Sequence, residues 1–402
     1  YACITGAPDL YADIALGRLS VTNSTQLRNQ VTKTLEYLTN PAPGPWLTQT
    51  LLVAHMMGGE FQYRACKEYI HATLIPDTAF TVKTAYGDTA GVNNALVTSR
   101  INAGQGIVNY RGHGMATLWW QWNIVREDWT TANVHALDNG GYTPIVFNVA
   151  CQTHKIQDAA ESLGEAWLNK YPGGAVASLG ATDDGITYPN QNYDKQLYRA
   201  FCQEGLYRLG WISNSAAAYI LVHDPTYAPW NVKMYLWLGD PALEVWTNTP
   251  AALAVTHPAT ALIGSSEFAV SVSADGVPLN DALVCLWKAG EVYQTQSTTE
   301  GVATFSIAPA TPGTLAVTVT KHDYLPYTAD VPVGTLLADV NADGLVNAFD
   351  IDPFVSALTM GEAEFVSQYA TWAYWAADCN QDGLVNAFDI DPFVALLTAG
   401  GE

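Results

Sequence analysis

The chain is short of positive charge and has no long apolar run. Its 402 residues include 17 Lys and Arg against 38 Asp and Glu, which gives a formal net charge of −21. Because such a balance repels phosphate groups at range, we exclude nucleic acid as a partner. No apolar run approaches the roughly 20 residues that a membrane-spanning helix needs, so we expect no membrane span. No basic leader with an apolar centre opens the chain, so we expect an exported protein to have lost its leader already.

The six cysteines are scattered without the short spacings that mark a shared site. They form no C-x-x-C pair and no zinc-type pattern, so we expect neither a disulfide framework nor a structural zinc. They are Cys3, Cys66, Cys151, Cys202, Cys285 and Cys379. Hydrophobic residues make up 49% of the chain, with 13 Trp and 21 Tyr, so most of it can bury a core. A typical size of roughly 150 residues per domain predicts two to four domains.

Three compositional regimes predict a multidomain protein, with domains at residues 1–247, 248–334 and 335–402. The first regime alternates short apolar runs with helical stretches. The runs are too short and too β-branched for helices and predict buried parallel strands at residues 50–54, 106–110, 144–149 and 174–179. We expect helices between them, at residues 26–38, 159–170 and 194–204. This pattern predicts an α/β domain whose mostly parallel sheet is flanked by helices.

The second regime consists of period-2 runs broken by Gly, Pro and Asp, at residues 267–273, 282–287 and 314–320. Evenly spaced short strands of this kind predict an all-β sandwich of immunoglobulin-like type. No catalytic pattern occurs in it. We interpret it as a spacer or packing partner, and a carbohydrate- or protein-binding face stays open as the alternative.

The third regime contains an internal repeat, because residues 343–355 recur unchanged as residues 382–394. Each copy belongs to an oxygen-rich loop with the spacing of EF-hand positions 1, 3, 5, 9 and 12, with Gly at position 6. The backbone carbonyl of a Leu fills position 7. The predicted ligands are Asp339, Asn341, Asp343, Leu345, Asn347 and Asp350, and Asp378, Asn380, Asp382, Leu384, Asn386 and Asp389. Calcium prefers six to eight oxygens, so we predict two Ca²⁺ sites.

Two features separate these repeats from ordinary EF-hands: position 12 is Asp instead of Glu, and a single helix follows each loop. The combination resembles a type I dockerin over residues 337–398. The resemblance implies a small α calcium-binding module and a cohesin-like partner that contacts loop positions 10 and 11, Ala348-Phe349 and Ala387-Phe388. These positions are apolar here, where many dockerins carry hydroxyl residues. A calcium-stabilised module without a partner is the alternative.

Two predicted strands of the first domain each end just before a residue suited to nucleophilic chemistry. His113 lies between Gly112 and Gly114 after one strand, and Cys151 follows the next. Because ligands and catalytic groups collect at the carboxyl ends of strands in an open α/β sheet, we expect both side chains to face one cleft. A nearby imidazole can lower the pKa of a thiol and later protonate the leaving amine. The N–H groups of Gly112, Gly114 and Cys151 are the predicted oxyanion donors.

The wider pattern resembles the gingipain family, peptidase family C25 of the caspase-like clan. The matching segments are residues 13–20, 108–114, 147–151 and 238–245, followed by a small β-sandwich. The resemblance implies a caspase-like fold and a secreted or cell-surface cysteine endopeptidase that cleaves protein or peptide substrates. It leaves room for further calcium ions in the first domain. Family members carry upstream strands that are missing before Tyr1, so we expect a separate N-terminal piece to stay associated.

A second departure concerns the Glu that orients the catalytic histidine in the family. Met57 takes its expected place, and Glu60 is the nearest carboxylate. We predict Glu60 as the third catalytic residue; an ordinary solvated Glu is the alternative. His154 lies three residues after Cys151 but lacks the strand-glycine context, so we place it at the rim of the cleft.

Substrate contacts are predicted from the segment of residues 180–186, which forms a wall of the specificity pocket in the resembled family. Asp183 or Asp184 is expected to face a basic side chain, although Asp-Asp-Gly is also an ordinary turn. Trp119 is a candidate for lining the cleft, with a place in the core as the alternative.

Two other functions compete with an active secreted peptidase. A peptidase-like scaffold that has lost its triad carboxylate would act as a cell-surface or assembly protein through its dockerin-like module. A caspase-like signalling protease inside the cell conflicts with the repeats and the sandwich, which are typical of exported proteins.

Overall fold

The computed structural model describes residues 3, 9–59, 62–76, 80–158, 160–264, 266–311, 313–334, 336–369, 373–380 and 382–399. The chain forms two compact units, residues 1–250 and residues 251–402. The second unit contains two separate hydrophobic cores, one in the sandwich and one in the C-terminal repeats. The domain borders at residues 247/248 and 334/335 stay a prediction. Among the described residues, no helix has the length and apolar character to span a membrane.

A seven-stranded sheet runs through the first unit in the order β1-β10-β9-β8-β4-β2-β3. Only the pairing of β10 with β9 is antiparallel, which confirms the mostly parallel sheet. Each predicted apolar run overlaps a strand. The strands are β1 (Gly17–Arg18), β2 (Gln49–Ala54), β3 (Thr81–Tyr86), β4 (Ile107–Arg111), β8 (Ile145–Val149), β9 (Ala177–Ala181) and β10 (Tyr235–Leu238).

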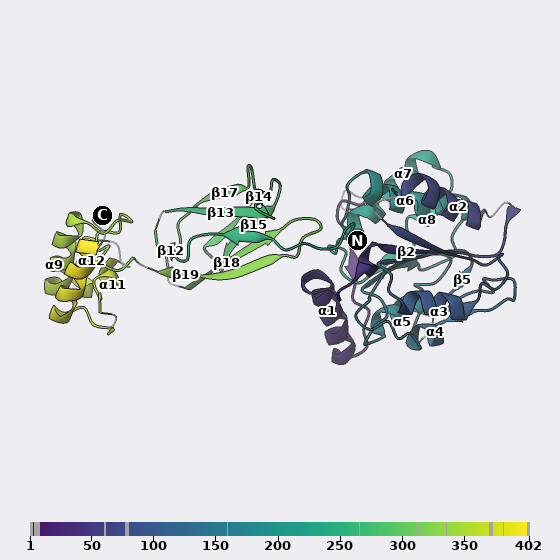
Figure 1. Cartoon of the computed structure of the whole chain (residues 1–402), viewed down its shortest axis with the longest axis horizontal. Coiled ribbons are helices and arrows are strands. Elements are labelled where there is room, and N and C mark those ends of the chain that lie inside the picture. The colour runs from purple at the N-terminus through teal and green to yellow at the C-terminus, as the bar shows by residue number, and fades with distance from the viewer. Residues whose placement is uncertain are drawn as a thin grey trace. The chain divides into compact units, whose positions relative to one another are not determined.

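Helices cover both faces of this sheet (Figure 1). One face carries α2 (Tyr63–Tyr69), α6 (Thr187–Gln203), α7 (Leu209–His223) and α8 (Ala228–Asn231). The other carries α3 (Asn94–Asn102), α4 (Thr131–His135) and α5 (Leu163–Asn169), and α1 (Ser24–Thr39) packs beside α5. The helix predicted from residue 159 begins later because Ser162 caps α5 through a capping box. The helix predicted at residues 194–204 is the second half of α6.

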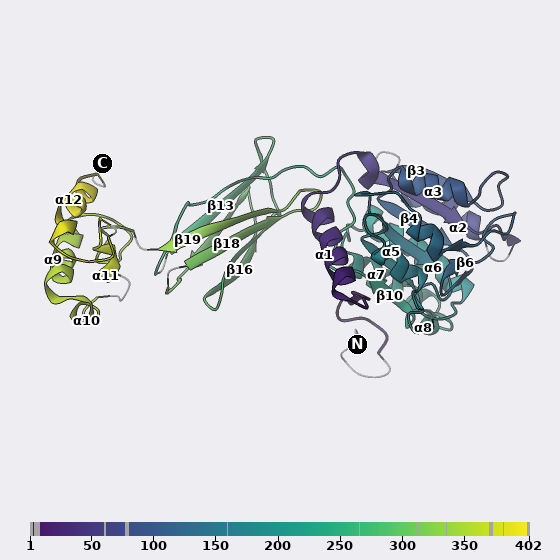
Figure 2. The same cartoon turned by 90° about the horizontal axis from the view of Figure 1, so that it is seen from below.

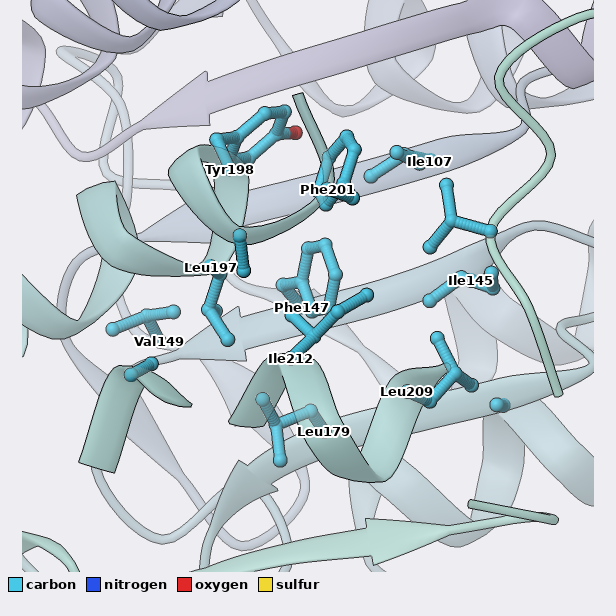
Figure 3. Close-up of a cluster of buried hydrophobic side chains, with 14 of the residues drawn as sticks. Ile107, Ile145, Phe147, Val149, Leu179, Leu197, Tyr198, Phe201, Leu209 and Ile212 are labelled. Carbon is cyan, nitrogen blue, oxygen red and sulfur yellow. The ribbon is translucent and has the colours of Figure 1, made fainter. Parts of the chain in front are cut away.

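The central strands are buried on both faces, as their apolar runs predict. Phe147 and Leu179 point toward Leu197 and Ile212 of α6 and α7 (Figure 3). The alternate residues of β4 and β8 join a second core under α3 and α5, which lie in front of the sheet in the turned view (Figure 2). Short connections complete the unit: the 3-10 helix Pro45–Thr48, the π-helix Ile70–Leu74, and strands β5 (Gly114–Met115), β6 (Leu118–Trp119) and β7 (Trp129–Thr130).

The sandwich consists of two sheets that share one hydrophobic core. One sheet contains β11 (Ala254–Thr256), β13 (Ser266–Ala274), β14 (Val277–Pro278) and β17 (Val302–Ile307). The other contains β12 (Ala261–Leu262), β15 (Leu283–Lys288), β16 (Val292–Ser297), β18 (Gly313–Thr320) and β19 (Tyr327–Gly334). Alternate residues of β13, β15 and β18 are buried, as period-2 patterning requires. The immunoglobulin-like type of this sandwich stays a prediction.

The C-terminal repeats pack equivalent residues against each other. Phe354 and Phe393 hold the same position in the two copies, and their stacked rings have centroids 3.8 Å apart. A single 10-residue helix follows each loop, as expected. The elements are the 3-10 turns Ala348–Asp350 and Ala387–Asp389, α9 (Ile351–Met360), α10 (Glu362–Phe365), α11 (Ala373–Ala376) and α12 (Ile390–Ala399).

Candidate active site

The sheet brings His113 and Cys151 to one edge. Strands β4 and β8 are parallel neighbours, with Arg111 opposite Val149 at their carboxyl ends. His113 and Cys151 each lie two residues beyond these ends. The two loops touch, because a Cβ atom on Gly114 would lie 2.7 Å from the carbonyl oxygen of Cys151. Glycine is therefore required at position 114 for this close approach.

Three aromatic side chains surround the half-buried His113 ring. The Tyr63 hydroxyl lies 3.3 Å from His113 Nε2, and the two rings are perpendicular with centroids 5.6 Å apart. The His55 ring, directly after β2, is also perpendicular, at 5.0 Å. The Trp120 ring, directly after β6, is perpendicular to the imidazole as well, with ring centroids 6.0 Å apart. The Tyr110 hydroxyl donates to the main-chain carbonyl of His113 at 2.8 Å, so the loop is held as well as the ring.

The guanidinium of Arg111 connects the surroundings of His113 with those of Cys151. Its Nη1 donates to the Val149 carbonyl at the end of β8, and its Nη2 to the Thr187 carbonyl at the start of α6. It also lies 4.8 Å from the centre of the Tyr63 ring. Arg111 is almost completely buried, so these contacts take the place of water around its positive charge.

The ionisation directions favour a neutral resting pair. Burial, followed by the positive charge of Arg111, lowers the pKa of His113. Burial raises the pKa of Cys151, the Gly185 N–H opposes this shift, and the negative charge of Asp184 adds to it. The Gly185 N–H lies 3.3 Å from the Cys151 sulfur. Both directions favour the uncharged thiol and the uncharged imidazole over a thiolate–imidazolium pair.

One of the predicted oxyanion donors is wrong. The Gly112 N–H makes a long, 3.5 Å hydrogen bond to the Val149 carbonyl and so extends the pairing of β4 with β8. A Cβ atom at Gly112 would also collide with Tyr110 and His55, so this glycine serves close packing. Gly114 and Cys151 stay as the predicted donors.

The segment of residues 180–186 lies against Cys151, as the sequence predicts for a wall of the cleft. Asp183 and Asp184 are both exposed. The Asp184 carboxylate accepts from the Gln152 side chain at 2.7 Å, and its main-chain carbonyl accepts from Trp230 Nε1 at 2.7 Å. Asp183 instead accepts from the Asp184 N–H. Asp184 is thus the carboxylate whose charge reaches Cys151.

The prediction that Trp119 lines the cleft is wrong. Its side chain is fully buried, stacks between Tyr110 and Trp129, and donates from Nε1 to Asn148. Strand β6 turns successive residues to opposite sides, so the neighbouring Trp120 contacts His113 instead. The core alternative is the correct one for Trp119.

His154 is not a rim residue either. It is fully buried, its Nε2 pairs with the Ser178 carbonyl, and burial lowers its pKa to about 4. Glu60 lies outside the described residues. Met57 donates its N–H to Nδ1 of His55, whose ring contacts that of His113.

Sequence reasoning missed Tyr63 and Arg111. Arg111 ends a strand whose other residues are buried, and only its position next to the Gly-His-Gly segment marks it. Tyr63 opens a helix far from His113 along the chain, and no local pattern distinguishes it from the other tyrosines. The only available signal for Tyr63 was its place in a helix that follows β2, the strand next to β4.

The two C-terminal loops turn their carboxylates inward onto main-chain N–H groups. Asp339 accepts from Asp343 and Gly344, and Asp350 accepts from Asn341 and Asn347. The second loop repeats these bonds at the equivalent residues. Asp350 and Asp389 are completely buried. Burial, then the charges of Asp350 and Asp343, raises the pKa of Asp339, against the effect of the Gly344 N–H.

This crowding of buried negative charge fits a cation. Among the described residues, however, no group of three or more His, Cys, Asp or Glu side chains is suited by itself to hold a metal ion. A calcium ion would therefore need the Asn side-chain oxygens and the main-chain carbonyls of Leu345 and Leu384 as well.

Comparisons with known proteins point to one family. The sequence model described as Peptidase family C25 matches residues 1–246. Gingipain R1 of Porphyromonas gingivalis is 25% identical over 377 residues, which cover 88% of this chain and 35% of that protein. Gingipain R2 of strain ATCC BAA-308 / W83 is 26% identical over 362 residues, covering 83% of this chain and 46% of that protein. The chain thus spans less than half the length of these curated relatives.

Solved structures show the same fold. The crystal structure of the Arg-specific cysteine proteinase gingipain R superimposes with a TM-score of 0.73 at 23% identity, covering 82% of this chain and 77% of that one. A complex of the pro- and mature domains of RgpB from Porphyromonas gingivalis superimposes with a TM-score of 0.72 at 23% identity, covering 82% of this chain and 79% of that one. The predicted caspase-like α/β fold is confirmed.

Proposed function

The chain belongs to peptidase family C25, and from this premise we propose that it is a cysteine endopeptidase with Cys151 as nucleophile and His113 as general base. The observation that carries the proposal is the shared sheet edge. The two residues follow neighbouring parallel strands, and their loops are in contact at Gly114. Neither a buried structural thiol nor a hydrogen-bonded core histidine requires this arrangement.

In the proposed reaction, His113 accepts the thiol proton as the Cys151 sulfur attacks the peptide carbonyl. The N–H groups of Gly114 and Cys151 donate to the developing oxyanion, and one such donor contributes about 3–4 kcal/mol in other acyl-transfer enzymes. The imidazolium then protonates the leaving amine. Water, deprotonated by His113, hydrolyses the thioester and restores the free thiol.

The substrate proposal is a protein or peptide with a basic side chain near the scissile bond. Asp184 supports it, because its exposed carboxylate lies in the segment that contacts Cys151. Gln152 and Trp230 hold this residue in place. Asp183 is the second candidate, because it is also exposed in this segment; its carboxylate accepts from the Asp184 N–H, as that of Asp184 accepts from Gln152.

We further propose that each C-terminal loop binds one calcium ion and that the repeats dock a cohesin-like partner outside the cell. The buried carboxylates of Asp350 and Asp389 support the calcium sites, and exposed Phe349 and Phe388, each 79% exposed, support a contact surface. Native mass spectrometry of the full chain tests the first point. Two calcium ions that leave on chelation are expected, and a metal-free chain would contradict the sites.

A catalytically impaired scaffold stays as the second candidate. The observation that favours it is the direction of the two pKa shifts, because a raised thiol pKa and a lowered imidazole pKa both oppose a reactive thiolate. In that case the molecule would act only through its C-terminal repeats.

Labelling of Cys151 separates the two candidates. We expect a peptidyl electrophile to modify Cys151 stoichiometrically at neutral pH and His113→Ala to abolish the modification. His135→Ala, which alters an exposed histidine paired with Glu161, is the matched control and should label like the wild type. A folded wild-type chain that leaves Cys151 unmodified would establish the scaffold.

A further inference from the structure

We propose that Arg111 is a positioning residue whose buried positive charge stabilises the negative charge that forms at Cys151 and drives the proton of the His113 imidazolium toward the leaving amine. The inference rests on the proposed function, because it assigns a role within the same site. It gives the guanidinium a part in the reaction in addition to its hold on the surrounding loops.

Hydrogen bonds fix the guanidinium of Arg111 among the segments that surround the sulfur. Its Nη1 donates at 3.2 Å to the carbonyl of Val149, two residues before Cys151. Its Nη2 donates at 2.9 Å to the carbonyl of Thr187, two residues after Gly185. The Gly185 N–H in turn lies 3.3 Å from the Cys151 sulfur. The positive charge is therefore held in place before any substrate arrives.

The charge of Arg111 is buried without a counter-charge. The side chain is 1% exposed, and none of the ion pairs among the described residues includes it. Its buried Nε finds no hydrogen-bond partner among these residues, and its other contacts are two neutral carbonyls and the Tyr63 ring. A guanidinium keeps its charge, and burying a charge without an opposite partner is costly. Negative charge that forms on the sulfur or on the oxyanion lowers this cost.

The two catalytic residues respond to a nearby cation as expected. Burial raises the pKa of Cys151, and the charge of Arg111 opposes this shift. Burial lowers the pKa of His113, and the charge of Arg111 adds to this shift. Arg111 thus favours a negative sulfur and disfavours an imidazolium. An imidazolium that forms during the attack therefore gives its proton to the leaving amine more readily.

The other titratable groups around the site leave Arg111 as its uncompensated positive charge among the described residues. Burial lowers the pKa of His55 to about 4 and raises that of Cys66 to about 12, so both are neutral. Lys67 and Asp194 form a buried ion pair at 2.7 Å, so their charges offset each other. Asp184 faces Cys151 from the segment after β9 and opposes Arg111. Burial also raises the pKa of the nearby phenols, which are those of Tyr63, Tyr110 and Tyr235.

The first test removes the charge and keeps a long side chain. Arg111→Met should raise the pKa of both Cys151 and His113 by about one pH unit. Cys151 should then react with iodoacetamide at pH 8 about three- to tenfold more slowly, because less thiolate is present. The acidic limb of kcat/KM on a fluorogenic peptide should move to higher pH, because His113 keeps its proton longer. Arg28→Met, which alters an exposed arginine of α1, is the control and should match the wild type in both readouts.

A second variant separates the charge from the hydrogen bonds. Arg111→Gln removes the charge but keeps an N–H donor for one of the two carbonyls. It should move the acidic limb as far as Arg111→Met does and lose less kcat, and thermal melting shows that each variant is folded. An arginine with only a structural role would lower kcat in both variants and leave the acidic limb at the wild-type pH. That outcome would overturn the inference.

A third measurement needs neither activity nor a stable variant at position 111. In the wild-type chain labelled with ¹⁵N-histidine, an NMR titration gives the pKa of His113, and His113→Ala assigns its signals. We expect a pKa below 6.5, and a value at or above 6.5 would overturn the inference whatever the variants do. Failure of wild-type Cys151 labelling by the peptidyl electrophile would reject the proposed peptidase function instead, so the two failures are distinguishable.

Discussion

The catalytic edge of the first unit and the two loops of the C-terminal repeats assemble their polar groups in opposite ways. Each loop draws its oxygens from a continuous stretch, residues 339–350 or 378–389. The catalytic edge draws on residues that follow β2, end β4 and follow β8, and on the start of α6. Sequence spacing alone therefore predicts a site that a single loop forms. A site whose residues come from several strands and helices forms only once the sheet and its helices have packed.

This difference implies that the two sites can be damaged separately. Substitutions in the sheet or its helices should disturb the catalytic edge and leave the loops intact. Loss of calcium should disturb the loops and leave the catalytic edge intact.

The largest effect is expected from Cys151→Ala. Removing the nucleophile should lower peptide turnover by at least about 10⁴-fold, because no other group can form the thioester. Cys285→Ala, in the sandwich, is the control and should keep full turnover. Calcium-dependent melting of the repeats should be the same in both variants. Residual turnover in Cys151→Ala close to wild type would refute Cys151 as nucleophile.

Lys33→Met should destabilise only the first unit. Lys33 of α1 is buried, and its three Nζ–H groups are shared among five main-chain carbonyls around the end of α5: Trp167, Leu168, Lys170, Gly173 and Ala175. Methionine leaves buried carbonyls without a donor, which costs about 3 kcal/mol of unfolding free energy. Chemical denaturation followed by tryptophan fluorescence measures the change. Exposed Lys233→Met is the control, and equal midpoints would show that the carbonyls find other donors.

Calcium removal should destabilise only the C-terminal repeats. At a calcium concentration of about 100 times Kd, binding stabilises the folded loops by about 2.7 kcal/mol, and chelation removes this stabilisation. Calorimetry of the full chain with calcium and with chelator should shift one transition and leave that of the first unit in place. A shift of the first unit instead would place a calcium ion near the sheet.

The pH dependence of Cys151 alkylation should reveal a neutral pair. The pKa of Cys151 is raised above its ordinary value of 9.0, and that of His113 is lowered below 6.5. Between these values the thiolate is the minor form, and its fraction grows about tenfold for each pH unit. The iodoacetamide rate, followed by mass spectrometry, should therefore keep rising past pH 9. A plateau near neutral pH would mean a thiolate–imidazolium pair instead.

The smallest effect is expected from Asp184→Asn. An exposed carboxylate contributes at most about 1 kcal/mol to a surface ion pair, so kcat/KM for basic substrates should fall no more than about fivefold. Substrates with a neutral residue at the same position should be unaffected. Asp138→Asn, which alters an exposed Asp shortly after α4, is the control and should leave both kinds of substrate unaffected. An equal loss for basic and neutral substrates would show that Asp184 holds the loop and does not select substrate.

The sequence predicts what depends on short-range pattern. The strands before His113 and Cys151 are recognisable as apolar runs of the right length, so both residues are found at one edge of the sheet. The oxygen-rich loops are found through their spacing alone. Calcium in them stays a prediction, as does a partner for the repeats.

The errors arise where packing decides. Trp119 belongs to a stacked series of rings with Tyr110, Trp129 and Trp167, and nothing in the segment tells which of its tryptophans turns inward. Tyr63 reaches His113 only because α2 packs against β2, next to β4. The Gly112 N–H is consumed by sheet pairing that extends beyond the apolar run.

Arg111 has an evolutionary consequence. The guanidinium that disfavours a charged imidazole also fastens the carbonyls at the end of β8 and the entrance of α6. Natural selection therefore cannot adjust the basicity of His113 through this position without loosening the nucleophile's loop. We expect descendants that lose this arginine to carry a compensating replacement at Tyr63 or Thr187.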